Sequence, residues 1–404
     1  MKGKTIAGLD IGTSSIKAVI ADVVGDNDSL NMKVIGVGEA SSGGVRKGNI
    51  VNIDNTVKSI LEAVQKAENM ACRKVSSYYV TVSGQNITGL SHTGSIAIKG
   101  GEVTQNDIAK VMDDAKAVKL NEDSIVVHVI PQDFSIDEQD GIKNPLGMSG
   151  VRLSSKVYIM TANAFAVKNV FTCMSKCGLN TNSLIISSYA SAHAVVTPEE
   201  KELGCCLIDI GGGTTDISVF CNGSIAHSAV LPFGGDYITN DIAKNLVMPI
   251  SEAENIKCRY GSLQGSHGER IEIPSIGGRE YRLVDKNDLT NIIVSRIEEL
   301  FNYIVSQFAK FNLRKGLSAG IILTGGTSLI PNLVPAAKNY FNMPVRIGSN
   351  MNASGLDLVN SPQYAASVGA IRYGFQKTSD DLIIQDNGTR GIIKRVKGIF
   401  SKYF

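Results

Sequence analysis

Two stretches of this chain carry nearly the same pattern, although they lie far apart in the sequence. The first reads Asp10-Ile-Gly-Thr-Ser-Ser-Ile-Lys17 and the second reads Asp209-Ile-Gly-Gly-Gly-Thr-Thr-Asp216. An apolar run precedes each stretch, and a second apolar run follows it. This order is typical of a strand, a tight turn and a return strand, so the sequence predicts two β-hairpins of the same design.

The turn residues of both hairpins suit an anionic ligand. Gly, Ser and Thr allow successive backbone N–H groups to point into one concavity, which attracts negative charge. Asp10 and Asp209 each end the first strand of a hairpin, where a carboxylate can hold a metal ion directly or through water. Two such hairpins that face each other would hold the phosphates of a nucleotide and its Mg²⁺ from both sides.

Length and composition narrow the class of protein. A chain of 404 residues is too long for one small core and predicts two or more domains. Its 43% hydrophobic and 19% charged residues are typical of a folded protein. The net charge of +2 and the absence of Trp argue against a dedicated nucleic-acid binder, so no nucleic-acid partner is expected.

The seven cysteines show no spacing of a disulfide framework or a zinc site, which predicts free thiols in a reducing, cytoplasmic compartment. A strand-like run follows directly after Met-Lys-Gly-Lys at the start, so no signal peptide is expected. No apolar run approaches the ~20 residues that span a bilayer.

The segment after the first hairpin changes character. Residues 84–157 combine weakly alternating runs, a helical stretch and a polar loop, Asp137-Glu-Gln-Asp-Gly-Ile-Lys-Asn-Pro-Leu-Gly. This stretch separates the first hairpin from the helical pattern at 163–177. We therefore expect a small inserted α+β subdomain. Near the other end, the polar residues 377–389 have the composition of a flexible linker.

The last fifteen residues, 390–404, form an amphipathic pattern with cations and no acidic residue. On a helix their apolar side chains fall within an arc of roughly 140°, and the cations fall outside it. A helix docked on its own domain is one interpretation. The flanking charges favour an interfacial helix in an anionic membrane. The membrane-facing segment comprises Ile392, Ile393, Lys394, Arg395, Val396, Lys397, Ile399, Phe400, Tyr403 and Phe404.

Taken together, these motifs resemble the actin-like ATPase superfamily. The stretches beginning at Asp10 and Asp209 resemble its two phosphate loops, and Leu323-Thr-Gly-Gly-Thr-Ser-Leu-Ile-Pro331 resembles its adenosine motif. Phe233-Gly-Gly-Asp-Tyr-Ile-Thr239 and Glu254-Asn-Ile-Lys257 resemble the nucleotide-contacting turn and helix of its second half. The small residues from Ala365 to Gly369 resemble the helix that links the two halves.

Within this superfamily the chain is similar to the FtsA family of bacterial cell-division proteins. His128-Val-Ile-Pro131-Gln132, Gly141-Ile-Lys-Asn-Pro145, Gly150-Val-Arg152 and the amphipathic tail carry this resemblance. It implies an α/β, actin-like (ribonuclease H-like duplicated) two-lobed fold with an inserted α+β subdomain and a C-terminal amphipathic helix. The implied segments are a first lobe (1–83, 163–195 and 362–376), the insert (84–162), a second lobe (196–230 and 316–361), its outer subdomain (231–315), a linker (377–389) and the membrane helix (390–404).

The resemblance also implies a site for ATP and Mg²⁺. Asp10 and Asp209 would hold Mg²⁺ through its waters, and Lys17 would reach the terminal phosphates. Turn geometry alone could explain the glycines, and Glu254 with Lys257 could be an ordinary surface pair. The implied nucleotide-binding residues are Gly12, Thr13, Ser14, Lys17, Gly211, Gly212, Gly213, Thr214, Thr215, Gly234, Gly235, Glu254, Lys257, Gly325, Gly326 and Thr327.

Rapid hydrolysis is not expected. Hydrolytic relatives orient water with Gln or Glu in the helix before the second hairpin. The matching position here is near Ser187, whose hydroxyl is no base at neutral pH. The sequence therefore predicts tight ATP binding with slow or no turnover, and names no catalytic residue.

The resemblance implies a scaffold that polymerises on the inner face of the cytoplasmic membrane at the division septum. Its partners would be a C-terminal peptide of FtsZ, further copies of itself, anionic lipid and other division proteins. Arg296 is a candidate contact for the acidic peptide, although a plain surface arginine fits equally well. The alternatives are a small-molecule kinase of the same superfamily and an actin-like adaptor of pilus assembly.

Overall fold

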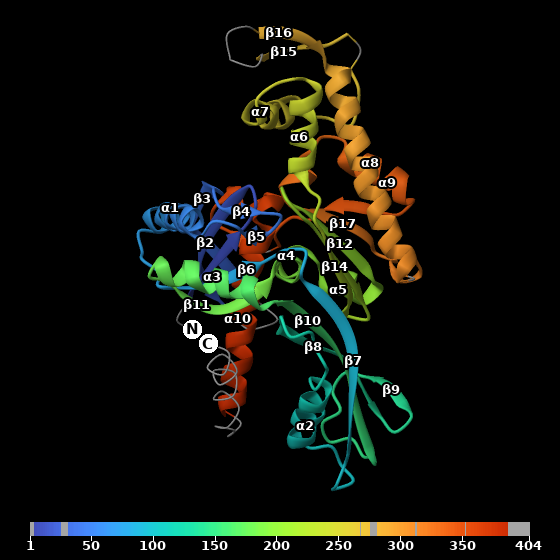
Figure 1. Ribbon diagram of the computed structural model, residues 1–404. Coiled ribbons are helices and arrows are strands. Elements are labelled where there is room, and N and C mark those ends of the chain that lie inside the picture. The colour runs from blue at the N-terminus through green and yellow to red at the C-terminus, as the bar shows by residue number, and fades with distance from the viewer. Residues whose placement is uncertain are drawn as a thin grey trace.

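The computed structural model describes residues 4–25, 31–266, 268–274, 281–311, 313–351 and 353–386. Two β-sheets form its centre, and the order β11-β6-β1-β2-β3 of the first matches β18-β17-β12-β13-β14 of the second, with β19 as an additional edge strand (Figure 1). The first has the order β11-β6-β1-β2-β3-β19, and the second has the order β14-β13-β12-β17-β18. The first sheet comprises β1 (Lys4–Ile11), β2 (Ser15–Val24), β3 (Asn31–Ser41), β6 (Ser77–Val82), β11 (Asn180–Ile186) and β19 (Ala353–Ser354). The second comprises β12 (Cys205–Ile210), β13 (Thr215–Cys221), β14 (Ser224–Leu231), β17 (Gly320–Thr324) and β18 (Val345–Ile347).

Each sheet is built around one of the two predicted hairpins. β1 pairs antiparallel with β2 and parallel with β6, and β12 pairs antiparallel with β13 and parallel with β17. The strands alternate little because both faces of each sheet are covered, which is typical of sheets packed between helices. The duplicated two-lobed α/β fold expected from the sequence is therefore confirmed.

Helices cover both faces of the first sheet and pack at its junction with the second. The helices are α1 (Ile53–Ala71), α2 (Gln105–Ala115), α3 (Ala164–Lys176), α4 (Ser187–Val195), α5 (Pro198–Leu203), α6 (Gly235–Asn245), α7 (Ile250–Tyr260), α8 (Lys286–Lys310), α9 (Leu333–Phe341) and α10 (Ala365–Asp386). α1 packs on β3 and β2, while α10 packs on β1 and against α4. Gly369 permits the α4–α10 contact, because a Cβ there would lie 1.8 Å from the carbonyl oxygen of Ala190. Each lobe has its own large apolar core.

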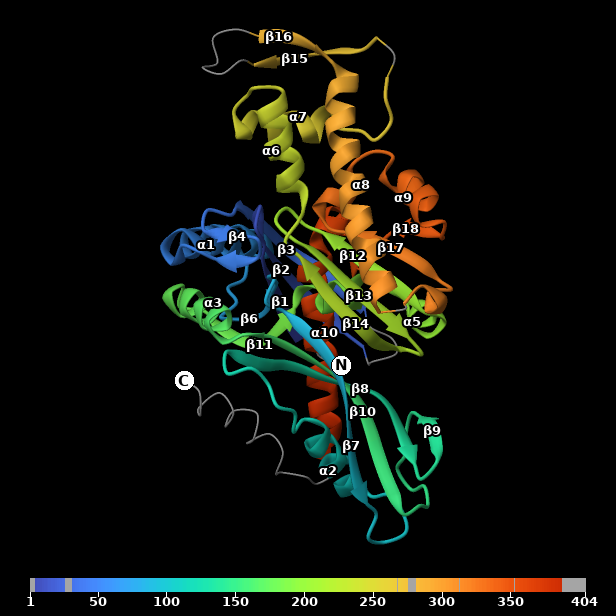
Figure 2. The ribbon, with the colours of Figure 1, turned by 45° about the vertical axis from the view of Figure 1, so that its right-hand side comes forward.

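The inserted segment forms a separate four-stranded sheet with the order β7-β10-β8-β9, covered by α2 (Figure 2). Its strands are β7 (Thr88–Ala97), β8 (Ser124–Ile136), β9 (Gln139–Ile142) and β10 (Arg152–Asn163). The insert is connected in sequence to the first lobe, and it also contacts the second lobe. The Tyr158 hydroxyl accepts the backbone N–H of Ser228 at 2.7 Å, and Gln132 donates to the carbonyl oxygen of Ile225 at 2.7 Å.

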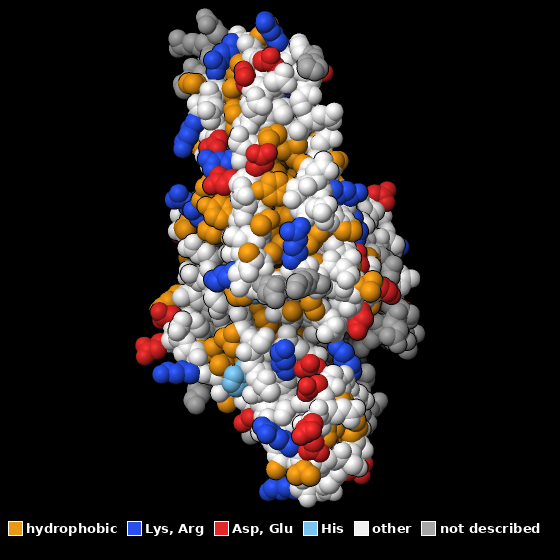
Figure 3. Space-filling model, turned by 90° about the vertical axis from the view of Figure 1, so that its right-hand side faces the viewer, with side chains coloured by type: hydrophobic (Ala, Val, Ile, Leu, Met, Phe, Trp, Pro, Cys, Tyr) orange, Lys and Arg blue, Asp and Glu red, His pale blue; other side chains and the backbone are white. Residues whose placement is uncertain are grey.

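Residues 235–310 extend the second lobe outward. α6, α7 and α8 pack together there with the hairpin of β15 (Arg270–Pro274) and β16 (Tyr281–Asp285). Elsewhere, between β3 and α1 in the chain, the short strands β4 (Val45–Arg46) and β5 (Asn49–Ile50) form a separate two-stranded sheet. Figure 3 shows the face that carries α8 and α9, on which hydrophobic side chains gather. Tyr303, Val305 and Tyr340 are among the exposed large hydrophobic residues of these two helices.

The C-terminal helix corrects one expectation. α10 continues to Asp386, so residues 377–386 are helical, although their composition predicts a flexible linker over 377–389. The physical reason is that no Gly or Pro follows Gly374 before Asp386 to end the helix. The predicted membrane helix at 390–404 lies outside the described residues. Within the described ranges, no helix combines the length and apolar character needed to cross a membrane.

All seven cysteines are free, as the sequence predicts. Burial raises the pKa of the Cys205 thiol to about 12 and that of Cys173 to about 11. These two thiols therefore belong to the cores and stay protonated.

Candidate functional site

A cleft of about 820 Å³ opens where the two hairpin turns face each other. This volume lies in the range of small-molecule and cofactor pockets, ~300–1,000 Å³. Most of the predicted site residues line it, although they come from distant parts of the chain. Those lining residues are Asp10, Gly12, Thr13, Ser14, Lys17, Asp209, Gly211, Gly212, Gly213, Thr214, Glu254, Lys257, Gly325, Gly326 and Thr327.

The two hairpin turns lie in direct contact, and glycine makes this possible. A Cβ on Gly213 would lie 2.6 Å from the Thr13 hydroxyl oxygen, and a Cβ on Gly212 would lie 1.8 Å from that of Ser14. The Ser14 hydroxyl also donates to Asp236 on α6 at 3.3 Å. The turn of one lobe therefore closes over the turn of the other, and larger side chains would separate them.

Two aspartates occupy equivalent places at the floor of the cleft, and each accepts a hydroxyl hydrogen bond. Thr81 donates to Asp10 at 2.5 Å, and Ser191 donates to Asp209 at 2.6 Å. Burial raises the pKa of Asp10, although the Lys17 ammonium opposes the rise. Burial raises the pKa of Asp209 to about 6, and the charge of Asp10 adds to the rise. The floor of the cleft therefore favours a positive charge.

Asp216 is a site residue to which the sequence motifs assigned no role. It stands opposite Asp209 in the hairpin and accepts hydrogen bonds from Ser83 at 3.1 Å and Thr214 at 3.0 Å. Burial, followed by the charge of Asp209, raises its pKa to about 7. The repeated motif could have revealed it, because Asp216 occupies the register position that Lys17 occupies in the first hairpin.

Lys17 is the buried cation that the first lobe contributes to the site. It is only 8% exposed, and its ammonium lies 3.5 Å from a Glu39 carboxylate oxygen and 5.8 Å from the centre of the Tyr364 ring. The Tyr364 hydroxyl donates to Glu39 at 2.9 Å, which fixes the carboxylate beside the lysine. Lys17 is thereby held in the cleft, with Glu39 as the neighbouring charge.

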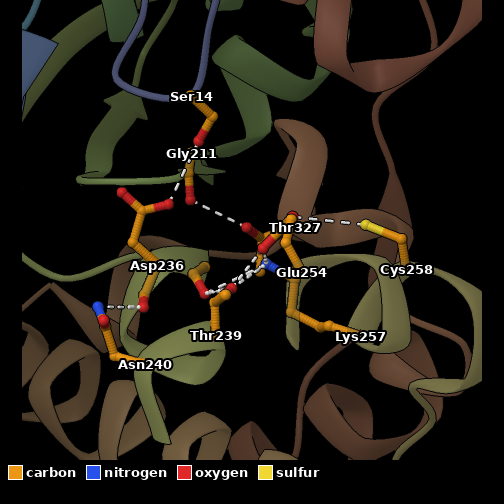
Figure 4. Close-up of polar contacts among 10 residues, drawn as sticks. Ser14, Gly211, Asp236, Thr239, Asn240, Glu254, Lys257, Cys258 and Thr327 are labelled. Carbon is orange, nitrogen blue, oxygen red and sulfur yellow. Dashed lines mark hydrogen bonds and ion pairs between the residues drawn. The ribbon is translucent and has the colours of Figure 1, made fainter. Parts of the chain in front are cut away.

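The opposite end of the cleft is built by α6 and α7 (Figure 4). The Lys257 ammonium donates to Glu254 at 2.6 Å and to the Thr239 hydroxyl at 2.8 Å, and Thr239 also donates to Glu254. Cys258 donates to the other Glu254 oxygen at 3.4 Å and lines the same cleft. Lys257 is 9% exposed and is fixed in the wall, whereas the Glu254 side chain is 46% exposed toward the cleft mouth and solvent.

Gly325 and Gly326 follow β17 and form the remaining wall. Gly325 has a φ of +85°, and a Cβ there would lie 2.4 Å from an Asp209 carboxylate oxygen. The backbone therefore approaches Asp209 as only glycine permits. By contrast, a Cβ on Gly326 would meet nothing closer than 3.9 Å. The Thr327 hydroxyl donates to the carbonyl oxygen of Gly211 at 2.9 Å and ties this wall to the second hairpin.

Three predicted residues lie behind the cleft rather than on its surface. The Thr215 side chain is buried and donates to the carbonyl oxygen of Phe233 at 2.8 Å, which corrects its assignment as a contact residue. Its neighbour Thr214 lies in the turn before β13 and lines the cleft. The Gly235 N–H donates to the carbonyl oxygen of Gly211 at 3.0 Å, and Gly234 packs against Gly212.

Ser187 begins α4 and lines the cleft, in the position expected from the sequence. Among the described residues, no three side chains of His, Cys, Asp or Glu form a group that could hold a metal ion by themselves. Arg296 lies elsewhere, on α8. Its guanidinium donates to Asp241 and to Glu299, and both carboxylates raise its pKa.

Solved structures of known proteins define the class of fold. The described architecture is similar to a chain of the PilM–PilN type IV pilus biogenesis complex, with a TM-score of 0.64, 15% identity, and coverage of 92% of this chain and 98% of that chain. It is also similar to MreB5 of Spiroplasma citri bound to ADP, with a TM-score of 0.54, 14% identity, and coverage of 94% and 98%. At these identities the likeness shows the fold alone. The duplicated sheets and the cleft between them define an actin-like ATPase fold.

Sequence comparison then gives the family. The sequence model described as cell division protein FtsA matches residues 206–369, and the model described as the SHS2 domain inserted in FtsA matches residues 84–161. The chain is 42% identical to cell division protein FtsA of Pseudomonas aeruginosa, over 96% of this chain and 93% of that protein. It is 38% identical to the Escherichia coli K12 protein of the same name, over 92% and 90%. The chain belongs to the FtsA family of cell division proteins.

Proposed function

We propose that this chain is an ATP-binding scaffold of bacterial cell division. The observation that carries the proposal is the contact of the two hairpin turns beside Asp10, Asp209 and the buried Asp216. Backbone N–H groups of the turns would cradle phosphate oxygens, and Lys17 would neutralise the terminal phosphates. The Glu254–Lys257 pair and the wall at Gly325 and Gly326 would bound the ribose and adenine.

Mg²⁺ would complete the charge balance of the site. Mg²⁺ in nucleotide sites is commonly held by one or two carboxylates, waters and the phosphates. Asp10 and Asp209 fit this arrangement, because both line the cleft and desolvation raises the pKa of each, to which the charge of Asp10 adds at Asp209. A bound cation would supply charge stabilisation of the phosphates, and Asp10 and Asp209 would hold it through its waters.

The position of Ser187 supports slow turnover. A serine hydroxyl at this place can donate a hydrogen bond to water but cannot accept its proton at neutral pH. We therefore propose that bound ATP stabilises the closed arrangement of the two lobes rather than being consumed rapidly. Steady-state hydrolysis faster than about one per second would contradict this proposal.

The tail at 390–404 would anchor the scaffold to the inner face of the cytoplasmic membrane at the division septum. One short amphipathic helix binds lipid weakly, and a polymer that presents many such helices gains avidity. Exposed apolar residues on α8 and α9, such as Tyr303 and Tyr340, support a contact with further copies of the chain or other division proteins. The family assignment disfavours the kinase and pilus-adaptor alternatives.

The proposed protein partner is a C-terminal peptide of FtsZ, bound at the outer part of the second lobe. Arg296 could contribute, although Asp241 and Glu299 already occupy its guanidinium. An acidic peptide would have to join or displace these carboxylates. If Arg296 exchanges these carboxylates for the peptide, Arg296→Glu should weaken peptide affinity. Unchanged affinity would remove Arg296 from the proposed peptide site.

Sedimentation with lipid vesicles tests this function. Full-length protein should sediment with vesicles that contain phosphatidylglycerol, and addition of ATP should increase the sedimented fraction. FtsZ should sediment only when the full-length protein is present. A variant that ends at residue 389 is the control and should remain in the supernatant with its ATP affinity unchanged. Equal sedimentation of both forms would contradict membrane attachment through the tail.

A further inference from the structure

A second cavity lies at the far edge of the first sheet, away from the nucleotide cleft. Its volume is about 580 Å³. The parallel strands β1, β6 and β11 start at this edge, whereas the cleft lies beyond their carboxyl ends. Since β1 has eight residues, roughly 25 Å separates the two edges. The cavity is therefore a separate feature of the fold.

Cations dominate the lining of this cavity. Lys4, Arg73, Lys74 and Lys377 line it together with Thr5, Ser76, Ser77 and Asn182, and none of the described residues that line it is acidic. Arg73 donates to Asp22 at 2.8 Å at the margin, which fixes its guanidinium. Lys377 donates to Ser183 at 3.3 Å and lies 5.9 Å from the centre of the Tyr373 ring. Cations beside hydroxyl and amide groups are the chemistry that recognises a phosphate group.

The position of the cavity indicates where the phosphate would come from. Lys377 belongs to α10, and α10 is the element that leads to the cationic tail at 390–404. A tail bound to membrane would hold this edge of the first lobe near the lipid surface. Each Lys or Arg near an anionic surface contributes about 1 kcal/mol of attraction. The edge carries four cations, of which Arg73 is paired with Asp22, so it keeps an excess of positive charge toward such a surface.

We propose that this basic cavity binds the phosphate of an anionic lipid headgroup. The folded body would then contact the membrane directly, in addition to the tail. The inference rests on the proposed function, because the tail brings the cavity to the lipid. It adds a consequence: two points of attachment fix the orientation of the first lobe on the membrane, and one tethered tail would leave it free to rotate.

Lysine footprinting of the full-length protein tests the site. Mass spectrometry measures the acetylation rates of Lys74 and Lys377 under three conditions. These are phosphatidylglycerol–phosphatidylcholine vesicles, pure phosphatidylcholine vesicles, and inorganic phosphate without vesicles. Only the first condition should slow acetylation of both lysines, by about threefold or more. Lys244 and Lys338, which are exposed on α6 and α9, should react at the same rate in all conditions. Equal protection by inorganic phosphate would overturn the lipid as the source.

Paired substitutions provide the second measurement. The variant K74Q/K377Q should bind anionic vesicles roughly tenfold more weakly, whereas K244Q/K338Q should bind as the unchanged protein does. Equal weakening by both pairs, or vesicle binding without protection of the two lysines, would overturn the cavity and leave membrane attachment by the tail intact. Failure of the full-length protein to sediment with any vesicle would overturn both proposals.

Discussion

The two hairpins share one backbone design and differ in the residue that faces each aspartate. β1 and β2 place Asp10 opposite Lys17, whereas β12 and β13 place Asp209 opposite Asp216. The first lobe thus contributes a cation to the cleft, and the second contributes a second buried carboxylate. The comparison teaches that the duplicated fold supplies the position of the site, while the residue opposite each aspartate decides its charge.

The difference also decides which half depends on a bound cation. Lys17 lowers the cost of ionising Asp10. In the second hairpin the charge of Asp209 instead raises the pKa of Asp216, since two neighbouring carboxylates resist simultaneous ionisation. Bound Mg²⁺ should therefore relieve the second lobe more than the first. The following variants test this contrast.

The largest effect is expected where the two hairpins touch. In Gly213→Val the new side chain would occupy the space of Thr13, so the turns could not close. Affinity for Mg²⁺–ATP should fall roughly 100-fold or more, measured by calorimetry. Gly326→Ala is the matched control, because that glycine lines the same cleft with room for a methyl group. Equal affinity of both variants would show that contact between the turns is unnecessary.

Removal of the first-lobe cation should have the next largest effect. Lys17→Ala deletes a charged hydrogen-bond donor, which is worth ~1.5–3 kcal/mol, so ATP should bind roughly 10- to 100-fold more weakly. The variant should also raise the pKa of Asp10, since the opposing charge is lost. Lys244→Ala, on an exposed face of α6, serves as the control. If the two variants bind ATP alike, Lys17 does not contact the phosphates.

The second lobe should reveal its carboxylate pair through pH. The pKa values of Asp209 and Asp216 are raised in the folded protein to about 6 and about 7, so the folded state holds protons that the unfolded chain releases near pH 4. Stability should therefore decrease as pH rises from about 4 to 7. Asp216→Asn should reduce this loss by about 2 kcal/mol, or a few degrees in Tm by calorimetry.

Saturating Mg²⁺–ATP should flatten the same pH profile in the unchanged protein, because the cation stabilises both ionised carboxylates. Lys17→Gln provides the comparison in the first lobe and should not reduce the loss of stability with rising pH, because removal of this charge raises the pKa of Asp10 further. A pH profile that Asp216→Asn does not alter would contradict the assignment of a strained carboxylate pair to the second hairpin.

Cys258 offers a smaller effect that reports on the α7 wall. Bound nucleotide should slow maleimide labelling of Cys258 several-fold, because the thiol lines the cleft beside Glu254. Cys72 is exposed at the end of α1, outside the cleft, and should label at an unchanged rate. Mass spectrometry after short labelling at pH 8 distinguishes the two. Protection of both thiols would indicate a global change rather than occupancy of the cleft.

The smallest effect on ATP is expected at Thr215. Thr215→Val removes the hydrogen bond to Phe233 and should cost about 1 kcal/mol of stability, yet ATP affinity should stay within about twofold. Its neighbour Thr214 lines the cleft and accompanies Asp216, so Thr214→Val should weaken binding more. The reverse order of the two effects would contradict the placement of Thr214 in the cleft and of Thr215 behind it.

The sequence predicted the duplicated fold and most of the residues that line the cleft, because repeated motifs encode both. It misplaced Thr215, since a run of hydroxyl residues does not reveal which side chain faces the ligand until the strand register is known. It missed Asp216 and Asp236 as cleft residues for a similar reason: their role depends on neighbours from other elements, Ser83 and Ser14 respectively. The helical continuation of α10 depended on the absence of a stop signal rather than on a motif.

The central claim is that the opposing lobes hold a magnesium nucleotide between Asp10 and Asp209. Isothermal titration calorimetry with ATP, with and without Mg²⁺, tests it most directly. The unchanged protein should bind one ATP tightly only with Mg²⁺, and the double variant Asp10→Asn/Asp209→Asn should lose the Mg²⁺ dependence. Absence of binding by the unchanged protein, or identical binding by both proteins with and without Mg²⁺, would contradict the account.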